Sequence, residues 1–353
     1  MQHRAAVIGI GEAGIAHIRA FEALAIPVEV VCDINPKTVQ RIREYEVATQ
    51  ARYTPNIRDV AKDNSVDMVT ICTPDHAHLE PVITMLEAGK HVLIEKPTVT
   101  TWEDLHTLSV EVKKAKRKYP TLRVVSFEKY HYSPRNIVLR NLVRSGKLGK
   151  ISCVEGSYVW SNSRSQILQG WRSDPRHPYN VVAGGAWHSI ALLSWLLGLR
   201  VRRVVALGNR KAFEPNELVS PDTVVTILEF EEDLLGVSKA LLGVEATPLV
   251  PRTIFLWIVG TGGAFFAGVK PEEDKVALSG NDSSSIDLPT EGVPSWKEFS
   301  QFLFTSMIND FVQVIDSGQE PEFTLDDAIH VTAVTLAAFE SCREGGIWKH
   351  IPE

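Results

Sequence analysis

Residues 9–14 read Gly-Ile-Gly-Glu-Ala-Gly, between a short apolar run at Ala5–Ile8 and a stretch of helical spacing. G-x-G-x-x-G after a strand and at the start of a helix lets the glycine backbone approach a pyrophosphate. A second apolar run, Val28–Cys32, leads into Asp33, nineteen residues after Gly14. An acid about 20 residues further on binds the ribose 2′-hydroxyl in such units. The sequence therefore predicts a dinucleotide-binding unit; the alternative is a tight turn followed by a turn aspartate.

Strand-like and helix-like stretches alternate along residues 1–126. Further apolar runs occur at Val66–Cys72, His91–Glu95 and Arg123–Phe127, and helical patterns at Gly14–Ala25, Leu79–Ala88 and from Thr101 to near Lys118. Asn35 and Pro36 predict the N-cap and the first residue of one more helix. Alternation of this kind is typical of a parallel sheet with crossover helices.

The pattern changes after a helix expected at Ser133–Ser145. Longer strand-like runs follow at Ile151–Ser161, Val201–Leu207, Thr223–Phe230, Leu235–Val244 and Thr253–Val259, with helices at Ala186–Leu197, Ser300–Ser317 and Leu325–Arg343. Several connections are short, which favours antiparallel pairing. We predict an α/β chain of two domains: residues 1–126 with a doubly wound parallel sheet, and residues 127–353 as an α+β domain with a large, mostly antiparallel sheet.

The composition excludes several classes of protein. Of the 353 residues, 44% are hydrophobic and 23% are charged, as in average globular chains. The formal net charge of −6 argues against a non-specific nucleic-acid binder. The sequence contains no run of about 18 apolar residues, so no membrane span is expected. The four cysteines form no CxxC pair, which favours a reducing compartment, so we expect a cytoplasmic protein.

Two side chains are candidates for proton and charge chemistry. Lys96, in Glu95-Lys96-Pro97, follows a predicted strand, and ligands of open α/β sheets bind at the carboxyl ends of the strands. A lysine there stabilises the alkoxide that develops as hydride leaves. His188 lies early in an apolar helix, and histidine moves protons near neutral pH. By position alone, a surface lysine and a structural histidine are the alternatives.

His76 and His78 also follow a predicted strand, and their spacing raises the question of a metal site. A metal needs more ligands than two histidines, and neither a carboxylate nor a thiolate in a ligand spacing accompanies them. We expect them to line the crevice wall, and we predict no metal.

The chain resembles the Gfo/Idh/MocA oxidoreductases over essentially its whole length. The resemblance rests on the glycine fingerprint, on residues 86–97 (Leu-Glu-Ala-Gly-Lys-His-Val-Leu-Ile-Glu-Lys-Pro), on residues 145–151, on residues 170–175 (Gly-Trp-Arg-Ser-Asp-Pro) and on residues 192–198 (Leu-Leu-Ser-Trp-Leu-Leu-Gly). It implies hydride transfer between nicotinamide and a sugar or cyclic-polyol carbon. Lys96 matches the family's catalytic lysine, and His188 its acid/base histidine.

The resemblance also implies contacts for cofactor and substrate. Those expected for NAD, rather than NADP, are Gly9, Ile10, Gly11, Glu12, Ala13, Gly14, Asp33, Thr73, Pro74, His78, Glu95, Lys96, Trp171 and Arg172. Those expected for the substrate are Tyr130, Tyr158, Arg172, Asp174 and His188.

The sequence departs from the family pattern near His188. The two family aspartates fall on Gly184 and Ala191, and Asp174 is the candidate replacement. Tyr130 or His131 stands where relatives often have arginine. The stretch Trp160–Asn180 holds four basic or titratable side chains: Arg164, Arg172, Arg176 and His177. They either bind an anionic group, such as a phosphate or carboxylate, or belong to a solvated loop. We favour the solvated loop.

We therefore expect an NAD(H)-dependent oxidoreductase acting on a secondary alcohol or ketone of a sugar-like substrate. One alternative is a family member whose tightly bound NAD drives elimination, epimerisation or glycoside cleavage without net redox. The other is a catalytically silent NAD-binding regulator, which the missing aspartates favour and the presence of Lys96 and His188 opposes. A homodimer or homotetramer through the C-terminal sheet is expected, because few helices remain to cover its second face.

Overall fold

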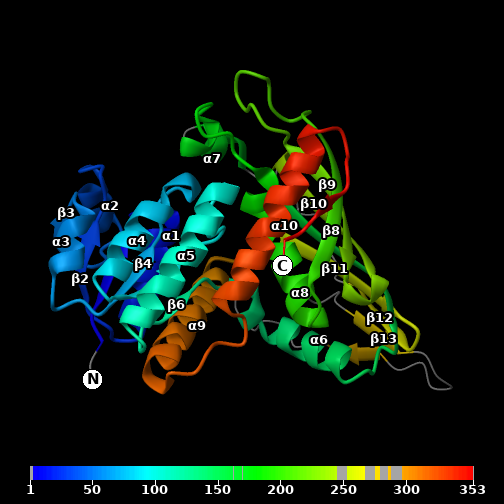
Figure 1. Cartoon of the computed structure of the whole chain (residues 1–353), viewed down its shortest axis with the longest axis horizontal. Coiled ribbons are helices and arrows are strands. Elements are labelled where there is room, and N and C mark those ends of the chain that lie inside the picture. Colours follow the sequence, from blue (N-terminus) through cyan, green and yellow to red (C-terminus); the bar gives the residue numbers. More distant parts are fainter. Residues whose placement is uncertain are drawn as a thin grey trace. The chain divides into compact units, whose positions relative to one another are not determined.

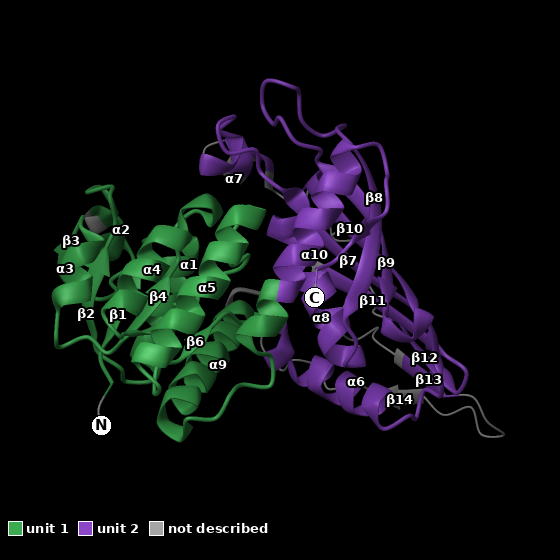
Figure 2. Ribbon diagram, in the orientation of Figure 1, with its two compact units in different colours: residues 1–129, 293–329 green, residues 130–292, 330–353 purple. Residues whose placement is uncertain are grey.

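The computed structural model describes residues 3–161, 163–168, 170–244, 253–266, 275–278, 285–287 and 296–352. The chain divides into two compact units, coloured separately in Figure 2. The first unit comprises Met1–Lys129 and Val293–Ile329, and the second comprises Tyr130–Gly292 and His330–Glu353. The continuous ranges expected from the sequence, 1–126 and 127–353, differ from these units chiefly in residues 293–329, which return to the first unit.

The first unit is built on a parallel sheet of six strands in the order β3-β2-β1-β4-β5-β6 (Figure 1). The strands are β1 (Ala5–Ile8), β2 (Val28–Cys32), β3 (Arg52–Thr54), β4 (Met68–Ile71), β5 (His91–Ile94) and β6 (Val124–Val125). The helices are α1 (Glu12–Ala23), α2 (Thr38–Glu44), α3 (Ile57–Lys62), α4 (Leu79–Glu87), α5 (Trp102–Lys118) and, from the far end of the chain, α9 (Trp296–Ser317). This strand order is that of dinucleotide-binding sheets, so the predicted parallel sheet is confirmed.

The central strands of this sheet end in register. Ile8 of β1 pairs with Ile71 of β4, which pairs with Ile94 of β5. All three isoleucines are buried. The loops that follow them therefore begin side by side at one edge of the sheet, where open α/β sheets bind their ligands.

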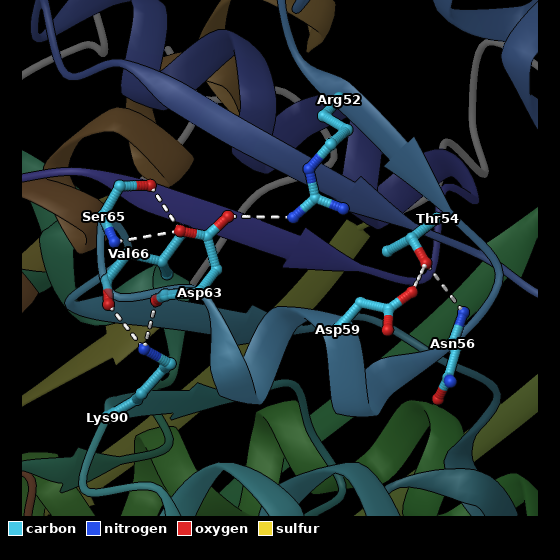
Figure 3. A network of polar contacts seen from close by, with 8 residues as sticks. All are labelled: Arg52, Thr54, Asn56, Asp59, Asp63, Ser65, Val66 and Lys90. Carbon is cyan, nitrogen blue, oxygen red and sulfur yellow. Dashed lines mark hydrogen bonds and ion pairs between the residues drawn. The ribbon is translucent and has the colours of Figure 1, made fainter.

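The opposite edge is closed by a polar network, drawn in Figure 3. The ammonium group of Lys90, just before β5, donates to the carbonyl oxygens of Asp63 and Val66 at 2.7 Å each. The Asp63 carboxylate accepts from Ser65 and from Arg52 on β3. Hydrogen bonds from Ser65, and then the Arg52 guanidinium, lower the pKa of Asp63 to about 2. These bonds fix the amino ends of β4 and β5 at the edge opposite to Ile71 and Ile94.

Helix α9 returns to the first unit and packs against α1. The ring of His17 on α1 lies 5.3 Å from that of Phe304 on α9, and Gln301 donates to the Ala16 carbonyl oxygen at 3.2 Å. The ammonium group of Lys129 lies 4.6 Å from the centre of the Phe304 ring. A segment distant in sequence thus supports the helix that follows the glycine fingerprint.

The second unit contains a nine-stranded sheet among its described residues, in the order β14-β13-β12-β11-β7-β10-β9-β8-β15. The strands are β7 (Ile151–Ser161), β8 (Val201–Asn209), β9 (Thr223–Phe230), β10 (Leu235–Val244), β11 (Thr253–Gly260), β12 (Gly263–Phe266), β13 (Lys275–Leu278), β14 (Ser285–Asp287) and β15 (Lys349–His350). Only the β7–β10 pair among these is parallel, so the mostly antiparallel sheet is confirmed.

The helices of the second unit are α6 (Pro134–Arg144), α7 (Ser163–Leu168), α8 (Trp187–Leu197) and the greater part of α10 (Leu325–Arg343). Helix α8 packs on β7, where Gly156 permits close approach: a Cβ there would lie 2.9 Å from Cβ of Ser189. A π-helical turn, Val182–Ala186, leads directly into α8. The sequence pattern predicts a helix from Ala186 and does not indicate the π-helical turn that precedes it.

The predicted helix start at Asn35-Pro36 is wrong. Helix α2 begins at Thr38, and Asn35 instead closes a turn. Its side-chain oxygen accepts from the Lys37 N–H at 3.1 Å, and its carbonyl oxygen accepts from the Thr38 N–H at 3.0 Å. Asparagine bonds equally well to backbone in a turn and at a cap, and here the turn is the structure that forms.

Candidate active site

The glycine fingerprint forms a cradle that is open at one point. Gly9 has φ of +91°, and a Cβ there would lie 2.5 Å from the carbonyl carbon of Cys72. A Cβ at Gly14 would overlap the carbonyl oxygen of Gly9. Gly11, the N-cap of α1, would place its Cβ with nothing within 4 Å. Two glycines thus close the turn and the third faces open space, which fits a pyrophosphate approaching the N-terminus of α1.

Asp33 lies directly beside this cradle, at the end of β2. The Ile10 N–H donates to its Oδ2 at 2.8 Å, and the Asn35 N–H donates to its Oδ1 at 2.8 Å. The next residue, Ile34, is 87% exposed. The carboxylate is therefore held in place by backbone, as a ribose-binding acid must be, and each oxygen keeps a further lone pair for a hydroxyl.

Glu95 and Lys96 follow β5 at the same edge. The Glu95 carboxylate accepts from the His17 ring at 2.9 Å and from the Lys96 backbone N–H at 3.1 Å. Burial acts to raise the pKa of Glu95, but the hydrogen bond and charge of His17, with Lys96 and Lys129, lower it. Burial acts to lower the pKa of His17, but Cys72 and Glu95 raise it. The Glu95 side chain thus forms a partly buried ion pair with His17 and also accepts from the backbone N–H of Lys96.

Thr73, Pro74 and His78 follow β4 and are tied to the same loop. The His78 ring is buried, with its Nδ1 2.9 Å from the Pro97 carbonyl oxygen and its Nε2 3.0 Å from that of Thr73. Each ring nitrogen faces a backbone carbonyl oxygen, so the His78 ring lies between the loop after β4 and the loop after β5. No group of three or more His, Cys, Asp or Glu side chains able to hold a metal ion occurs in the described part of the chain.

His188 lies in an aromatic pocket of the second unit. It is 4% exposed, and its ring lies 5.2 Å from that of Tyr130 and 5.4 Å from that of Tyr158. The π-helical turn just before it is capped by Asn180, whose side-chain oxygen accepts from the Val182 and Ala183 N–H groups. π-Helical turns often mark functional positions. The structure thus brings together three of the residues expected at the substrate.

Gly184 is small because Tyr179 uses its space. A Cβ at Gly184 would overlap the hydroxyl group of Tyr179, which is buried. A Cβ at the next residue, Gly185, would lie 2.8 Å from the ring of Tyr158. A phenol therefore occupies the position where the family resemblance expects a carboxylate.

The arginines of residues 160–180 have different partners. Arg164 forms an ion pair with Glu217 at 2.5 Å. Arg176 holds the Asp174 carboxylate through its backbone and guanidinium N–H groups at 2.6–3.1 Å, which holds the pKa of Asp174 well below its usual range. Arg172 is surrounded by aromatic rings, including that of Trp171. The expectation of a solvated loop holds for Arg176 and does not hold for Arg172.

The candidate residues predicted from the sequence lie in recognisable motifs. Two residues of the site, His17 and Tyr179, lie outside any motif and were not predicted. His17 appears in the sequence as one polar residue on an apolar helix, and only the fold brings it to Glu95. Tyr179 lies in a stretch interpreted as an insertion. The roles of Lys96 and His188 as a pair stay a prediction, as they belong to different units.

Two family models match the chain. One, described as an oxidoreductase family with an NAD-binding Rossmann fold, matches residues 3–121, and its C-terminal alpha/beta domain matches residues 140–350. A solved structure of a levoglucosan dehydrogenase with NADH and levoglucosan has a TM-score of 0.82 at 22% identity, covering 100% of both chains.

Among curated relatives, the scyllo-inositol 2-dehydrogenase (NAD(+)) of Bacillus subtilis is 24% identical over 98% of this chain and 96% of its own. The levoglucosan dehydrogenase of Pseudarthrobacter phenanthrenivorans is 28% identical over 54% of this chain, which spans only half of that relative's length (50%). The α-N-acetylgalactosaminidase of Shewanella oneidensis is 27% identical over 44% of this chain and 35% of its own.

Proposed function

Because the chain belongs to the Gfo/Idh/MocA oxidoreductase family, we propose that it transfers hydride between NAD(H) and a secondary alcohol or ketone of a sugar-like or cyclic-polyol substrate. The observation that carries the proposal is the register of β1, β4 and β5. It brings the loops that follow these strands, with the open glycine cradle, Thr73 and Lys96, to one edge of the parallel sheet. The glycine cradle and the loop that carries a lysine thus lie at the same edge of the sheet.

In this proposal the cradle and Asp33 hold the dinucleotide, and NAD supplies the hydride acceptor. Lys96 donates a hydrogen bond to the substrate oxygen and stabilises its negative charge as the hydride leaves. His188 takes the hydroxyl proton in oxidation and returns it in reduction. The rings of Tyr130 and Tyr158 hold the imidazole in one orientation. His17 and Glu95 keep the backbone at Lys96 in place.

The second candidate is a redox-neutral reaction with NAD retained on the protein. The similarity to an α-N-acetylgalactosaminidase favours it, although that match covers less than half of this chain. The phenol at the expected carboxylate position also separates this site from an ordinary Lys-Asp-His set.

A substrate panel tests the proposal. Neutral sugars, cyclic polyols, sugar acids and sugar phosphates are incubated with protein and NAD, and NADH absorbance and product mass are recorded together. We expect a product two hydrogens lighter than its substrate and one NADH per product. A product of unchanged or hydrolysed mass without free NADH supports the second candidate. The absence of both product and NADH supports the silent regulator.

The cofactor preference follows from Asp33. A 2′-phosphate would replace the hydrogen-bonded hydroxyl with charge repulsion, so NAD should bind at least about tenfold tighter than NADP. Calorimetry with the two cofactors measures the ratio. Asp33→Ser should bring the two affinities closer together. Equal affinities in the unaltered protein would contradict the role given to Asp33.

Assembly through the second sheet is part of the proposal. Six exposed apolar side chains lie on one face of β8–β12, and we call them the outer sheet face: Leu207, Val225, Ile227, Leu235, Trp257 and Phe266. Cross-strand pairs such as Leu207–Val225 and Trp257–Phe266 place them together. An apolar face of this kind suits a second copy of the chain.

All four cysteines are free thiols, which supports a cytoplasmic location.

We expect light scattering at micromolar concentration to find a homodimer or homotetramer. Ile227→Glu should shift it towards the monomer, because the new carboxylate would be buried between copies. Val110→Glu, at an exposed valine on α5, is the matched control and should leave the mass unchanged. A monomer in the unaltered protein would contradict the assembly proposal.

Among the described residues no helix has the length and apolarity of a membrane span.

A further inference from the structure

The ring of His3 lies between two carboxylates that are far apart in the sequence. Its Nδ1 lies 2.5 Å from Oδ2 of Asp67, and its Nε2 lies 2.9 Å from Oδ1 of Asp316. His3 stands just before β1, Asp67 directly precedes β4, and Asp316 is in the last turn of α9. Within the first unit, the ring therefore joins the beginning of the sheet to the C-terminal end of a helix from the far part of the chain.

This arrangement needs a protonated ring. A neutral imidazole has one N–H donor and one lone pair, whereas an imidazolium has two N–H donors. An ionised carboxylate only accepts hydrogen bonds. A neutral His3 could donate to Asp67 or to Asp316 and would turn a lone pair towards the other carboxylate. Both contacts are favourable together only when His3 carries its second proton.

The surrounding groups leave His3 as the one that changes charge near neutral pH. Further charged or titratable residues around these three are Arg4, Glu29, Lys90, His91 and Arg123. Of these, His91 is the second histidine, and its Nδ1 accepts from the Arg123 backbone N–H at 3.0 Å. Burial lowers the pKa of His91, Asp67 acts to raise it, and the charges of His3 and Arg123 lower it further. His91 therefore stays neutral beside a charged His3.

The pH dependence of the His3 contacts has a definite sign. Burial acts to lower the pKa of His3, but the hydrogen bonds and charges of Asp67 and Asp316 raise it above its ordinary value of 6.5. The stability that these contacts add is therefore fully present below about pH 6.5 and is lost as the pH rises through the folded-state pKa. The Asp67 and Asp316 side chains are 41% and 60% exposed, so water can solvate both carboxylates once the ring is neutral.

The end of α9 has two further attachments of a different kind. The Arg123 guanidinium donates to the Gly318 carbonyl oxygen at 2.6 Å, and the Lys116 ammonium group pairs with Glu320 at 3.1 Å. Arginine and lysine side chains keep their charge across neutral pH, whereas histidine does not. Among these three attachments, the one through His3 is therefore the one that responds to a proton.

We propose that His3 is a pH-dependent clamp, which holds the C-terminal end of α9 on the first unit when the ring is protonated and releases it when the ring is neutral. Because α9 packs against α1, the helix that follows the glycine fingerprint, the clamp makes the packing of this unit depend on pH. The proposal does not rest on the proposed function, since it involves neither substrate nor hydride transfer.

Hydrogen exchange measured by mass spectrometry on the full chain tests the clamp. The protection of residues 308–320 is compared at about pH 6 and about pH 9, after correction for the pH dependence of exchange itself. We expect protection to be roughly threefold or more higher at the lower pH, the effect of partly exposed ion pairs. His3→Gln should show the lower protection at both pH values. His106→Gln, at an exposed histidine on α5, is the matched control and should behave like the unaltered protein.

NMR titration of the histidine ring protons gives a second readout. The resonance that is missing from His3→Gln identifies His3, and we expect its midpoint above 6.5 in the unaltered protein. Asp316→Asn keeps an acceptor and removes one charge, so it should lower that midpoint. This variant changes an exposed side chain, and it keeps the test available if His3→Gln does not fold.

Two results would overturn the proposal. The first is a His3 midpoint at or below about 6.5 in the unaltered protein, or the same midpoint in Asp316→Asn. The second is protection of residues 308–320 that changes with pH equally in the unaltered protein and in His3→Gln. Because neither readout needs turnover, failure of the proposed oxidation leaves the result on the clamp intact.

Discussion

Lys96→Ala is expected to lower turnover by about 100-fold or more, the range observed when one donor that stabilises developing charge is lost. The Lys96 backbone N–H donates to the Glu95 carboxylate at 3.1 Å, and we propose that the Lys96 ammonium group acts on the substrate oxygen chiefly as hydride leaves. Affinity for NADH should change by less than about threefold, because the glycine cradle and Asp33 are untouched. Steady-state kinetics and NADH calorimetry on the same preparation give both quantities.

Lys62→Ala is the matched control for Lys96, since Lys62 is an exposed lysine in the last turn of α3 in the same unit. It should keep full turnover. If Lys96→Ala retained more than about a tenth of the turnover, the catalytic role of Lys96 would be contradicted. A proportional loss of NADH affinity would assign Lys96 to cofactor binding instead.

His188→Ala is also expected to lose about 100-fold or more in turnover, because acid/base transfer contributes 10²–10⁴-fold in enzymes. The limb of the pH–rate profile near neutrality should flatten, which a merely structural histidine would not cause. The double variant with Lys96→Ala should lose less than the product of the two single losses, since both residues are proposed to act on one substrate oxygen. His106→Ala, at an exposed histidine on α5, is the control. An unchanged profile in His188→Ala would redirect the search to Tyr130 and Tyr158.

The parts of the fold with strong periodicity or a strict motif could be predicted from the sequence. The strands β1, β2, β7, β9 and β10 have the predicted bounds, as does α10. Alternating or continuous apolar runs define a strand by themselves, and Gly9 and Gly14 are needed wherever this turn forms. The short β3 and α3 were missed, because three-residue and six-residue elements give too little pattern.

Tertiary partners could not be predicted in the same way. The helical pattern at α9 predicts a helix but not that it packs on α1, since periodicity defines an apolar face and not its neighbour. The same holds for the arginines of residues 160–180. Only the fold shows that Glu217 and Asp174 pair with two of them and that rings surround Arg172. The Tyr179 hydroxyl beside Gly184 is a further contact that sequence spacing does not encode.

The central claim is that this chain moves hydride from a substrate carbon to NAD and releases NADH. The most direct measurement uses the best substrate of the panel with deuterium on the carbon that is oxidised, followed by mass spectrometry of cofactor and product after turnover. The account predicts NADH carrying one deuterium, in amounts equal to the oxidised product, and a product without the label. Product formed with the label returned to it, and with no labelled NADH released, would contradict the account.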